Sequence, residues 1–252
     1  SERHRYYHTL GHVCSVFNRL GHNIHSLLFA ICHDIVYNPR SKTNEEDSIE
    51  YIKKTGLNNL VTAEVFNVLC LHILDTKDIS KVTNYNIADR HDVLGDLDQL
   101  IKYFELIKKE FQCYQHSDFI DAHCSIIMKI RDVHQANKSV SNEYMKHVRK
   151  PINNIGIYVG SFNPFHVGHY GVLLEAEKLF SKVVLAKGFN PEKVLEYNNS
   201  EILEWRDVPS ALLCKETVIY TGTIFDLYDK YSKLYEKVTF IKGFRNHQDI
   251  EY

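Results

Sequence analysis

One stretch, residues 155–169, constrains the fold of this chain more than any other. It reads IGIYVGSFNPFHVGH, in which alternating apolar residues end at a glycine, a turn follows, and His166 and His169 open an apolar run with helical spacing. The pattern predicts a buried strand over 155–160 and a helix over 166–180, with both histidines on one face of the first helical turn. Because a helix start offers unpaired N–H groups and a positive dipole end, the sequence predicts a phosphate site here.

Residues 151–252 alternate short apolar strands with helix-like segments. The expected strands are 182–187, 217–221 and 238–241, and the expected helices lie near 200–213 and over 223–234. This alternation predicts an α/β, Rossmann-like fold with a parallel sheet, in which ligands bind at the carboxyl ends of the strands. Those ends carry the segments Gly160-Ser161, Lys187 to Lys193, Thr221-Gly222-Thr223 and Lys242 to Arg245. Their glycine turns and converging cations predict a polyphosphate site.

Residues 1–150 show helical spacing and no strand alternation, so we expect an all-α domain. Helix-like segments are expected over 10–20, 60–74, 94–104, 117–133 and 143–148. The apolar period changes after a polar joint that contains Pro151, which predicts a domain boundary between 1–150 and 151–252. The chain opens at Ser1 in a helix-like segment, so we expect a further segment before it.

The composition is that of a globular protein without a general affinity for nucleic acids or membrane surfaces. Hydrophobic residues make up 44% and charged residues 25%, with a formal net charge of −2. No apolar run approaches the roughly 20 residues that span a bilayer. The six cysteines are scattered without a CxxC pair, which favours a reducing compartment, and we expect a cytoplasmic protein. Lysines such as Lys215 are expected at the surface and aromatic residues such as Phe225 in the core.

Several histidines and aspartates of the first half have apolar helical surroundings. They are His8, His12, the pair His33-Asp34 and Asp96. Because a buried imidazole or carboxylate is costly unless something binds it, these residues are candidate metal ligands. Two imidazoles and two carboxylates suit a six-coordinate ion such as Mn, Fe or Mg better than structural zinc. Taken singly, each histidine is more simply explained as an ordinary core or surface residue.

The segments HRYYHTLGHV, ICHDIVYNPRSKTNEEDS, LDTKD and LGDLDQL, in this order, resemble the HD-superfamily metal-dependent phosphohydrolases. The resemblance spans most of residues 3–133 and implies one or two bound divalent metal ions. The implied metal ligands are His12, His33, Asp34 and Asp96, with His8, Glu45 and Lys77 around them. Ile79 stands where such proteins usually have a histidine, so hydrolysis of a nucleotide-like phosphoester stays open.

The segment GSFNPFHVGH is close to the GxFDPxHxGH signature of the nucleotidyltransferase superfamily. Three further segments, NPEK, VIYTG and IKGFRNHQDIEY, resemble those of the phosphopantetheine adenylyltransferases. The resemblance implies transfer of AMP from ATP, accompanied by Mg²⁺, to 4′-phosphopantetheine, giving dephospho-coenzyme A and pyrophosphate. The implied catalytic residues are His169, Lys193 and Lys242. The implied binding residues are Gly160, Ser161, Phe162, His166, Gly168, Thr221, Gly222, Gly243, Arg245, Asp249 and Glu251.

Alternatives stay open for both halves. Nicotinamide mononucleotide as acceptor or CTP as donor fits the same chemistry, since other branches of the superfamily share the His166-x-Gly168-His169 form. Alternatively, the first half is the active enzyme, a phosphohydrolase, and the second half is a nucleotide-binding sensor. The adenylyltransferase family continues past the position of Tyr252, so we expect the second domain to be incomplete in these residues. A homo-oligomer also stays open.

Overall fold

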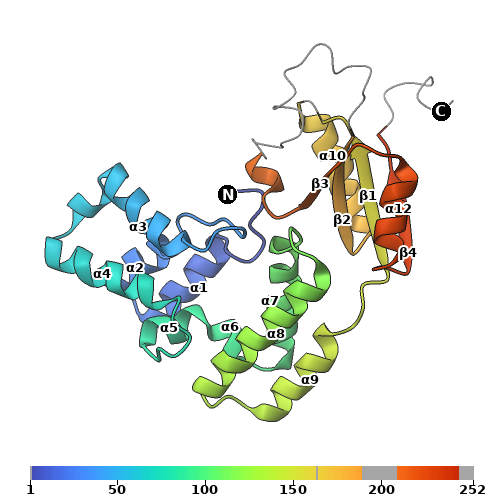
Figure 1. The fold of residues 1–252 in the computed structure, drawn as a ribbon. Coiled ribbons are helices and arrows are strands. Elements are labelled where there is room, and N and C mark those ends of the chain that lie inside the picture. The colour runs from blue at the N-terminus through green and yellow to red at the C-terminus, as the bar shows by residue number, and fades with distance from the viewer. Residues whose placement is uncertain (1, 163, 189–208, 244–252) are drawn as a thin grey trace. The chain divides into compact units, whose positions relative to one another are not determined.

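The computed structural model describes residues 2–162, 164–188 and 209–243 (Figure 1). They form two compact units, which are treated separately below. The first unit comprises Ser1–Phe111 and Ser117–Lys150, and the second comprises Gln112–His116 and Pro151–Tyr252. The division falls between Lys150 and Pro151, at the polar joint, but it also assigns a short internal segment of the first half to the second unit. Within the described residues, no helix is long and apolar enough to cross a membrane.

The described part of the first unit is helical, as the sequence predicts. Its α-helices are α1 (Leu10–Leu20), α2 (Ile24–Cys32), α3 (Asn44–Thr55), α4 (Ala63–Asp75), α5 (Asn84–Asp89), α6 (His91–Leu94), α7 (Leu97–Glu110), α8 (His116–Val133) and α9 (Lys138–Val148). One apolar cluster, around Phe29 and Ile52, contains residues of every helix from α1 through α5. A second cluster, around Leu100 and Ile127, contains residues of every helix from α6 through α9. Burial of these faces against one another holds the short helices, which would be marginal in isolation.

The structure divides the predicted helix over 94–104 into α6 and α7. The chain leaves helical geometry at Gly95 and Asp96, where Asp96 is the N-cap of α7. Its side chain accepts the backbone N–H of Gln99 at 2.9 Å, and the Gln99 side chain accepts the backbone N–H of Asp96 at 3.1 Å. This reciprocal capping box starts a new helix, although the apolar spacing continues across the break.

The second unit is built on a four-stranded parallel sheet, which confirms the α/β prediction. Its strands are β1 (Asn154–Gly160), β2 (Lys182–Gly188), β3 (Glu216–Tyr220) and β4 (Lys237–Ile241), in the order β3-β2-β1-β4. Ile157 pairs with Val184 of β2 and with Phe240 of β4, so β1 is an inner strand of the sheet. The observed ends of these strands lie within about one residue of the predicted ones, because each strand is a short apolar run bounded by turn residues.

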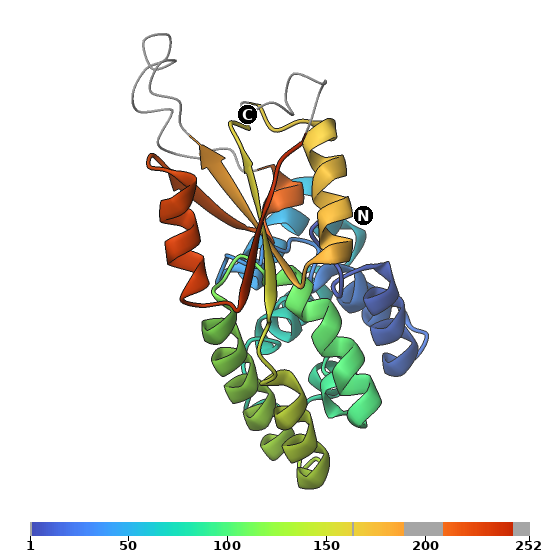
Figure 2. The ribbon, with the colours of Figure 1, turned by 90° about the vertical axis from the view of Figure 1, so that its right-hand side faces the viewer.

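Helices cover both faces of this sheet (Figure 2). Alternate residues of β1 divide between the faces: Ile155 and Ile157 pack with the helix α12 (Ile224–Ser232), and Tyr158 packs with α10 (Val167–Leu179). Burial on both sides explains why the inner residues of β1 and β2, IGIYV and VVLA, are apolar rather than alternating with polar residues.

Two expectations about the second unit are wrong. Lys215 is 2% exposed, and its Nζ pairs with Glu177 and donates to Gln112 Oε1 at 3.2 Å. A lysine is tolerated there because a buried charge can be compensated by a partner of opposite sign. Phe225, in contrast, is 79% exposed, because it lies on the outer side of the first turn of α12.

A second buried ion pair holds the segment Gln112–His116 in the second unit. Lys182 and Glu216, the first residues of β2 and β3, pair at 2.5 Å. Lys182 Nζ also donates to the Tyr114 carbonyl at 2.7 Å, and Gln115 Nε2 donates to Glu216 Oε1 at 2.9 Å. These hydrogen bonds explain why five residues from the first half belong to the sheet domain.

Candidate functional site

The first candidate site is a cluster of four side chains from three helical elements of the first unit. His12 lies in α1, His33 and Asp34 follow α2 directly, and Asp89 is the last residue of α5. One ligand atom from each lies within 4.8 Å of all the others, and both histidines are buried. His12 Nε2 lies 3.2 Å from His33 Nε2 and 3.2 Å from Asp89 Oδ1, and His33 Nε2 lies 3.0 Å from Asp34 Oδ2. We call these four residues the metal cluster.

The donor atoms of the metal cluster fit a divalent ion. His33 Nδ1 donates to the carbonyls of Phe29 and Ala30, each at 3.1 Å, so the neutral ring carries its lone pair on Nε2, the atom that faces the cluster. Ligand atoms bound at about 2.1 Å from one ion lie at most about 4.2 Å apart. The distances between the nitrogens and the carboxylate oxygens, 3.0 to 3.7 Å, meet this limit.

The charges of the metal cluster also favour a cation. Burial would raise the pKa values of Asp34 and Asp89, but the neighbouring imidazoles outweigh it and hold both carboxyl pKa values well below their usual range. Burial would lower the pKa of His33, but Asp34 and Asp89 raise it well above its usual value. The two carboxylates therefore stay ionised and create a site in which a divalent ion would replace the proton on His33.

Asp96 does not belong to this cluster, contrary to the resemblance-based prediction. It is exposed and caps α7, and Asp89 offers the fourth candidate ligand atom instead. The sequence itself favours a capping role for Asp96, because this residue opens the pattern Asp-x-x-Gln, which is typical of a helix start. Asp89 follows the apolar residues Ile87 and Ala88, much as Asp34 follows an apolar helix. This similarity is the only feature of the sequence that could have identified Asp89 as a candidate ligand.

Beside the metal cluster, the partly exposed His8 contacts the buried Glu110. His8 Nε2 lies 4.0 Å from Asp34 Oδ2, and His8 Nδ1 lies 2.6 Å from Glu110 Oε2. Burial would raise the pKa of Glu110, but hydrogen bonds from His8 and its charge lower it to about 2. Glu110 was not predicted, since nothing in the sequence of α7 distinguishes it from the partly exposed Glu105.

Glu45 and Lys77, also predicted near the metal ligands, lie in a more exposed ion-pair group. Lys77 Nζ is 2.8 Å from Glu46 Oε2 and 3.4 Å from Glu45 Oε2. Burial raises the pKa of Glu45, the charge of Lys77 opposes this, and the charge of Asp34 adds to it. Glu45 is therefore within electrostatic reach of the metal cluster. Ile79 packs against the apolar cluster around Leu100.

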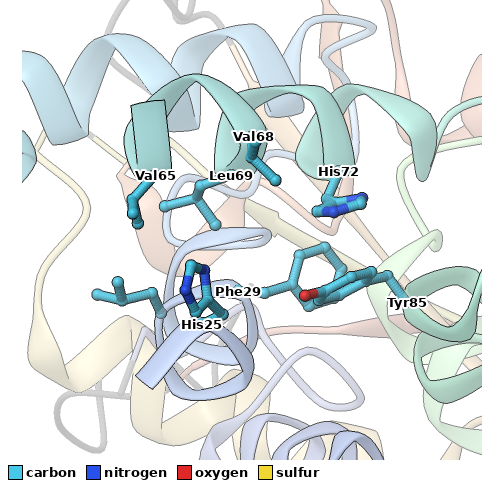
Figure 3. Close-up of a pocket in the computed structure, with 8 residues that line it drawn as sticks. His25, Phe29, Val65, Val68, Leu69, His72 and Tyr85 are labelled. Atoms are coloured by element: carbon cyan, nitrogen blue, oxygen red, sulfur yellow. The ribbon is translucent and has the colours of Figure 1, made fainter. Parts of the chain in front are cut away.

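A small pocket lies between α2 and α4 (Figure 3). It is lined by His25, Leu28, Phe29, Val65, Val68, Leu69, His72 and Tyr85. The ring of Phe29 stacks on His33 at 4.9 Å and meets Tyr85 at 4.8 Å, so Phe29 separates the pocket from the metal cluster. A volume of about 10 Å³ has room for about one water, so the pocket is too small for a substrate.

The second candidate site is the loop between β1 and α10. His166 is the N-cap of α10, and its Nδ1 accepts the backbone N–H of Gly168 at 3.1 Å. His169 Nδ1 accepts the backbone N–H of His166 at 3.3 Å, and the two rings stack with centroids 3.7 Å apart. Because both Nδ1 atoms accept, both neutral rings carry their proton on Nε2. The loop thus presents two N–H donors, side by side, at the positive end of a helix.

Aromatic packing and glycines hold this histidine pair. Phe162 is buried at a φ of 46°, and its ring meets the His169 ring edge-on at 5.2 Å. A Cβ on Gly160 would lie 2.7 Å from the Phe162 ring, so only glycine fits there. A Cβ on Gly168 would lie 3.1 Å from the His166 ring. The glycines of the signature therefore permit the close approach of the rings.

The other predicted nucleotide-site residues fall into two groups. Ser161, Thr221, Gly222, Lys242 and Gly243 directly follow β1, β3 and β4, and the side chains of Ser161, Thr221 and Lys242 are exposed. All four strands are parallel, so these residues share the edge of the sheet that carries the histidine pair. Lys193, Arg245, Asp249 and Glu251, and most of the predicted helix 200–213, lie outside the described residues.

Comparisons with known proteins bear on the second unit. A family model described as cytidylyltransferase-like matches residues 157–202, which include the histidine pair. The phosphopantetheine adenylyltransferase of Haemophilus ducreyi is 33% identical over 101 residues, covering 38% of this chain and 58% of that protein. That of Kocuria rhizophila is 32% identical over 98 residues, covering 37% and 58%, respectively. That of Neisseria meningitidis serogroup C is 27% identical over 101 residues, covering 38% and 55%.

No solved structure gives a significant match. The chain spans a little over half the length of the curated relatives that it matches. The region that carries the strand, the glycine turn and the histidine pair is thus similar to the cytidylyltransferase-like family model and to part of the phosphopantetheine adenylyltransferases.

Proposed function

We propose that the second unit transfers the AMP of ATP to 4′-phosphopantetheine, giving dephospho-coenzyme A and pyrophosphate. The observation that carries the proposal is the stacked pair His166 and His169, whose Nε2–H donors lie at the start of α10, the helix that follows β1. The similarity to phosphopantetheine adenylyltransferases supports the choice of acceptor.

The chemistry asks for positioning and charge neutralisation rather than for a base. The second pKa of a phosphate monoester is about 6, so the acceptor phosphate is mostly a dianion at neutral pH and can attack the α-phosphorus directly. Pyrophosphate leaves with the electrons of the broken P–O bond, and Mg²⁺ accompanies the triphosphate. In this proposal His169 donates to an oxygen of the transferred phosphoryl group, where negative charge develops. His166 and the dipole of α10 add to the same field.

Cations at the other strand ends complete the proposed site. Lys242 follows β4 at the same edge of the sheet and is proposed to neutralise the triphosphate. Lys193, predicted as catalytic, is proposed to bridge the acceptor phosphate and the α-phosphate, and Arg245, predicted to bind substrate, is proposed to add positive charge. Holding both substrates in line converts the reaction into an effectively intramolecular one.

Pyrophosphate release by the full chain tests this proposal. With ATP and Mg²⁺ present, 4′-phosphopantetheine should give faster release than nicotinamide mononucleotide, and ATP should be a better donor than CTP. A preference for nicotinamide mononucleotide or CTP would keep the transfer chemistry and reassign a substrate. Absence of release with every pair would contradict the proposal and favour the nucleotide-sensor reading.

We propose, second, that the first unit binds a divalent ion in the metal cluster and hydrolyses a nucleotide-like phosphoester there. The specific observation is that two imidazole nitrogens and two carboxylates converge within 4.8 Å. An ion held there would activate water and polarise a phosphoryl oxygen. His12 and His33 would bind it through Nε2, Asp34 and Asp89 would neutralise its charge, and His8 would border the substrate side.

Metal titration tests this second proposal. The full chain should bind Mn²⁺, Fe²⁺ or Mg²⁺ at about one or two equivalents, and His33→Ala should abolish binding. Hydrolysis is then assayed with a panel of nucleotide phosphoesters in the presence of the ion that binds. Wild-type protein that binds none of the three ions would contradict the proposal, whereas binding without hydrolysis would retain the metal site alone.

A further inference from the structure

Glu110, the last residue of α7, is a completely buried carboxylate to which neither proposed activity assigns a role. One of its oxygens, Oε1, accepts the backbone N–H groups of Tyr6, Tyr7 and His8 at 2.7, 2.6 and 3.0 Å. The other, Oε2, lies 2.6 Å from His8 Nδ1. The two oxygens thus do different things: one holds the backbone before α1, and the other holds an imidazole ring.

The ring of His8 is also held from other directions. Tyr37 stacks on it with centroids 4.1 Å apart and an interplanar angle of 28°, and Tyr7 meets it edge-on at 5.0 Å. Only 18% of the side chain is exposed. With this packing and the contact to Glu110, the ring has little freedom to turn, and its Nε2 lies 4.0 Å from Asp34 Oδ2 at the border of the metal cluster.

The contact with Glu110 also selects the tautomer of His8. An ionised carboxylate only accepts hydrogen bonds, so the hydrogen in the Glu110–His8 contact belongs to Nδ1. In the neutral ring, Nε2 therefore carries the lone pair. A carboxylate that fixes the far nitrogen of an imidazole facing a metal is a recurrent way to orient a ring and raise its basicity.

We propose that Glu110 is a positioning residue of the metal centre, which holds His8 so that the lone pair of Nε2 faces the ion bound in the metal cluster. The inference rests on the proposed metal binding of the first unit. It assigns Glu110 an effect on ion affinity that acts through His8 and is separate from its hydrogen bonds to the backbone.

Glu110→Gln separates the two tasks of this side chain. The amide keeps an oxygen for the three backbone N–H groups but presents an NH₂ group to His8 Nδ1, which must then accept. The neutral ring is forced into the other tautomer, with a hydrogen on Nε2 that faces the ion. We expect Mn²⁺ to bind the full-length variant about 10- to 100-fold more weakly than the wild type, measured by calorimetry or by the signal of free Mn²⁺.

The matched control is Glu105→Gln, a change of the same kind on the same helix. Glu105 is partly exposed and pairs with Lys108 at 3.0 Å, so its replacement should leave Mn²⁺ affinity unchanged. Thermal unfolding of both variants without metal checks that the fold is retained.

A double-mutant cycle decides whether Glu110 acts through His8. In a His8→Ala background, Glu110→Gln should change Mn²⁺ affinity by less than about 3-fold, because the two effects are not independent. Equal losses in both backgrounds would show a structural effect and overturn the inference, as would unchanged affinity in the wild-type background. Neither of these two results would contradict the proposed metal binding. Wild-type protein that binds no Mn²⁺, Fe²⁺ or Mg²⁺ would overturn both this inference and the proposed metal function.

Discussion

The two candidate sites are built in opposite ways. In the second unit, one loop and one helix start, from Gly160 to His169, supply both histidines, their caps and the ring that packs on them. In the first unit, the metal cluster draws its ligands from positions as distant as His12 and Asp89, which only the packing of α1, α2 and α5 brings together. A local site can be identified from neighbouring residues, whereas a dispersed site depends on correct placement of every helix.

The sites also differ in how they set the protonation of histidine. His166 and His169 accept backbone N–H groups, which leave Nε2–H as a donor suited to an anion. His33 donates to backbone carbonyls, which leaves the Nε2 lone pair as a ligand suited to a cation. Histidine thus suits an anion at one site and a cation at the other. The backbone group that contacts Nδ1 decides which, because it sets whether Nε2 carries a hydrogen or a lone pair.

The largest expected effect concerns the local site. His169→Ala removes one Nε2–H donor from the place where charge develops, so we expect nucleotidyl transfer to fall by about 100- to 1,000-fold in kcat. Pyrophosphate release with ATP and 4′-phosphopantetheine measures it. Lys178→Ala, on an exposed part of the same helix, is the control. Near-normal turnover of a folded His169→Ala protein would assign phosphoryl-group stabilisation to other residues.

Asp89→Asn tests the dispersed site. The variant keeps the size of the side chain and removes one of the two negative charges of the metal cluster. Loss of a partner that only orients a ligand already weakens metal binding by about 10- to 100-fold, so loss of a ligand charge should weaken Mn²⁺ binding by about 100-fold or more. Titration of the full chain with Mn²⁺ measures the change. Unaltered affinity would remove Asp89 from the ligand set and restore the case for another carboxylate.

A buried histidine outside the metal cluster, His123, should make the stability of the first unit depend on pH. His123 has no carboxylate partner among its described contacts, lies 2.6 Å from the Tyr144 hydroxyl, and has a pKa that burial lowers to about 4. Between its unfolded pKa of about 6.5 and pH 4, the unfolded chain binds a proton that the folded chain does not, so stability falls as the pH falls.

We therefore expect His123 to account for about 2 kcal/mol of the unfolding free energy lost between pH 7 and pH 5. Urea unfolding at both pH values measures the loss, and His123→Gln should reduce it by that amount, whatever the variant costs at pH 7. An equal loss in wild type and variant would mean that His123 already takes up its proton in the folded state.

The smallest expected effect separates Asp96 from Asp89. Asp96→Ala removes the side chain that caps α7, which should lower the unfolding free energy by about 1 kcal/mol and leave Mn²⁺ affinity unchanged. Urea unfolding and Mn²⁺ titration of one preparation give both values. If Asp96→Ala weakened Mn²⁺ binding and left the unfolding free energy unchanged, Asp96 rather than Asp89 would be the candidate metal ligand.

Most of the described part of the second unit could be predicted because its signals are local. Apolar runs bounded by turns fixed its four strands, and the glycines around the histidine pair marked close approaches of the backbone and rings. Lys215 shows where this reasoning fails: a lysine usually stays exposed, and the sequence carried no sign that Glu177 and Gln112 would surround it. Ion pairs between distant residues leave no periodic pattern in the sequence.

In the first unit, the sequence by itself indicated an all-α domain and several of its helices, but not α2, α3 or α5. The resemblance named three of the four residues of the metal cluster, His12, His33 and Asp34. Only the tertiary structure decided the fourth, because Asp89 and Asp96 are the same chemical group at helix ends on either side of α6. The break at Gly95 turns Asp96 into a cap, and the packing of α5 against α1 brings Asp89 to the histidines. Local hydrogen bonding can be inferred from spacing, but the convergence of charges depends on how helices pack.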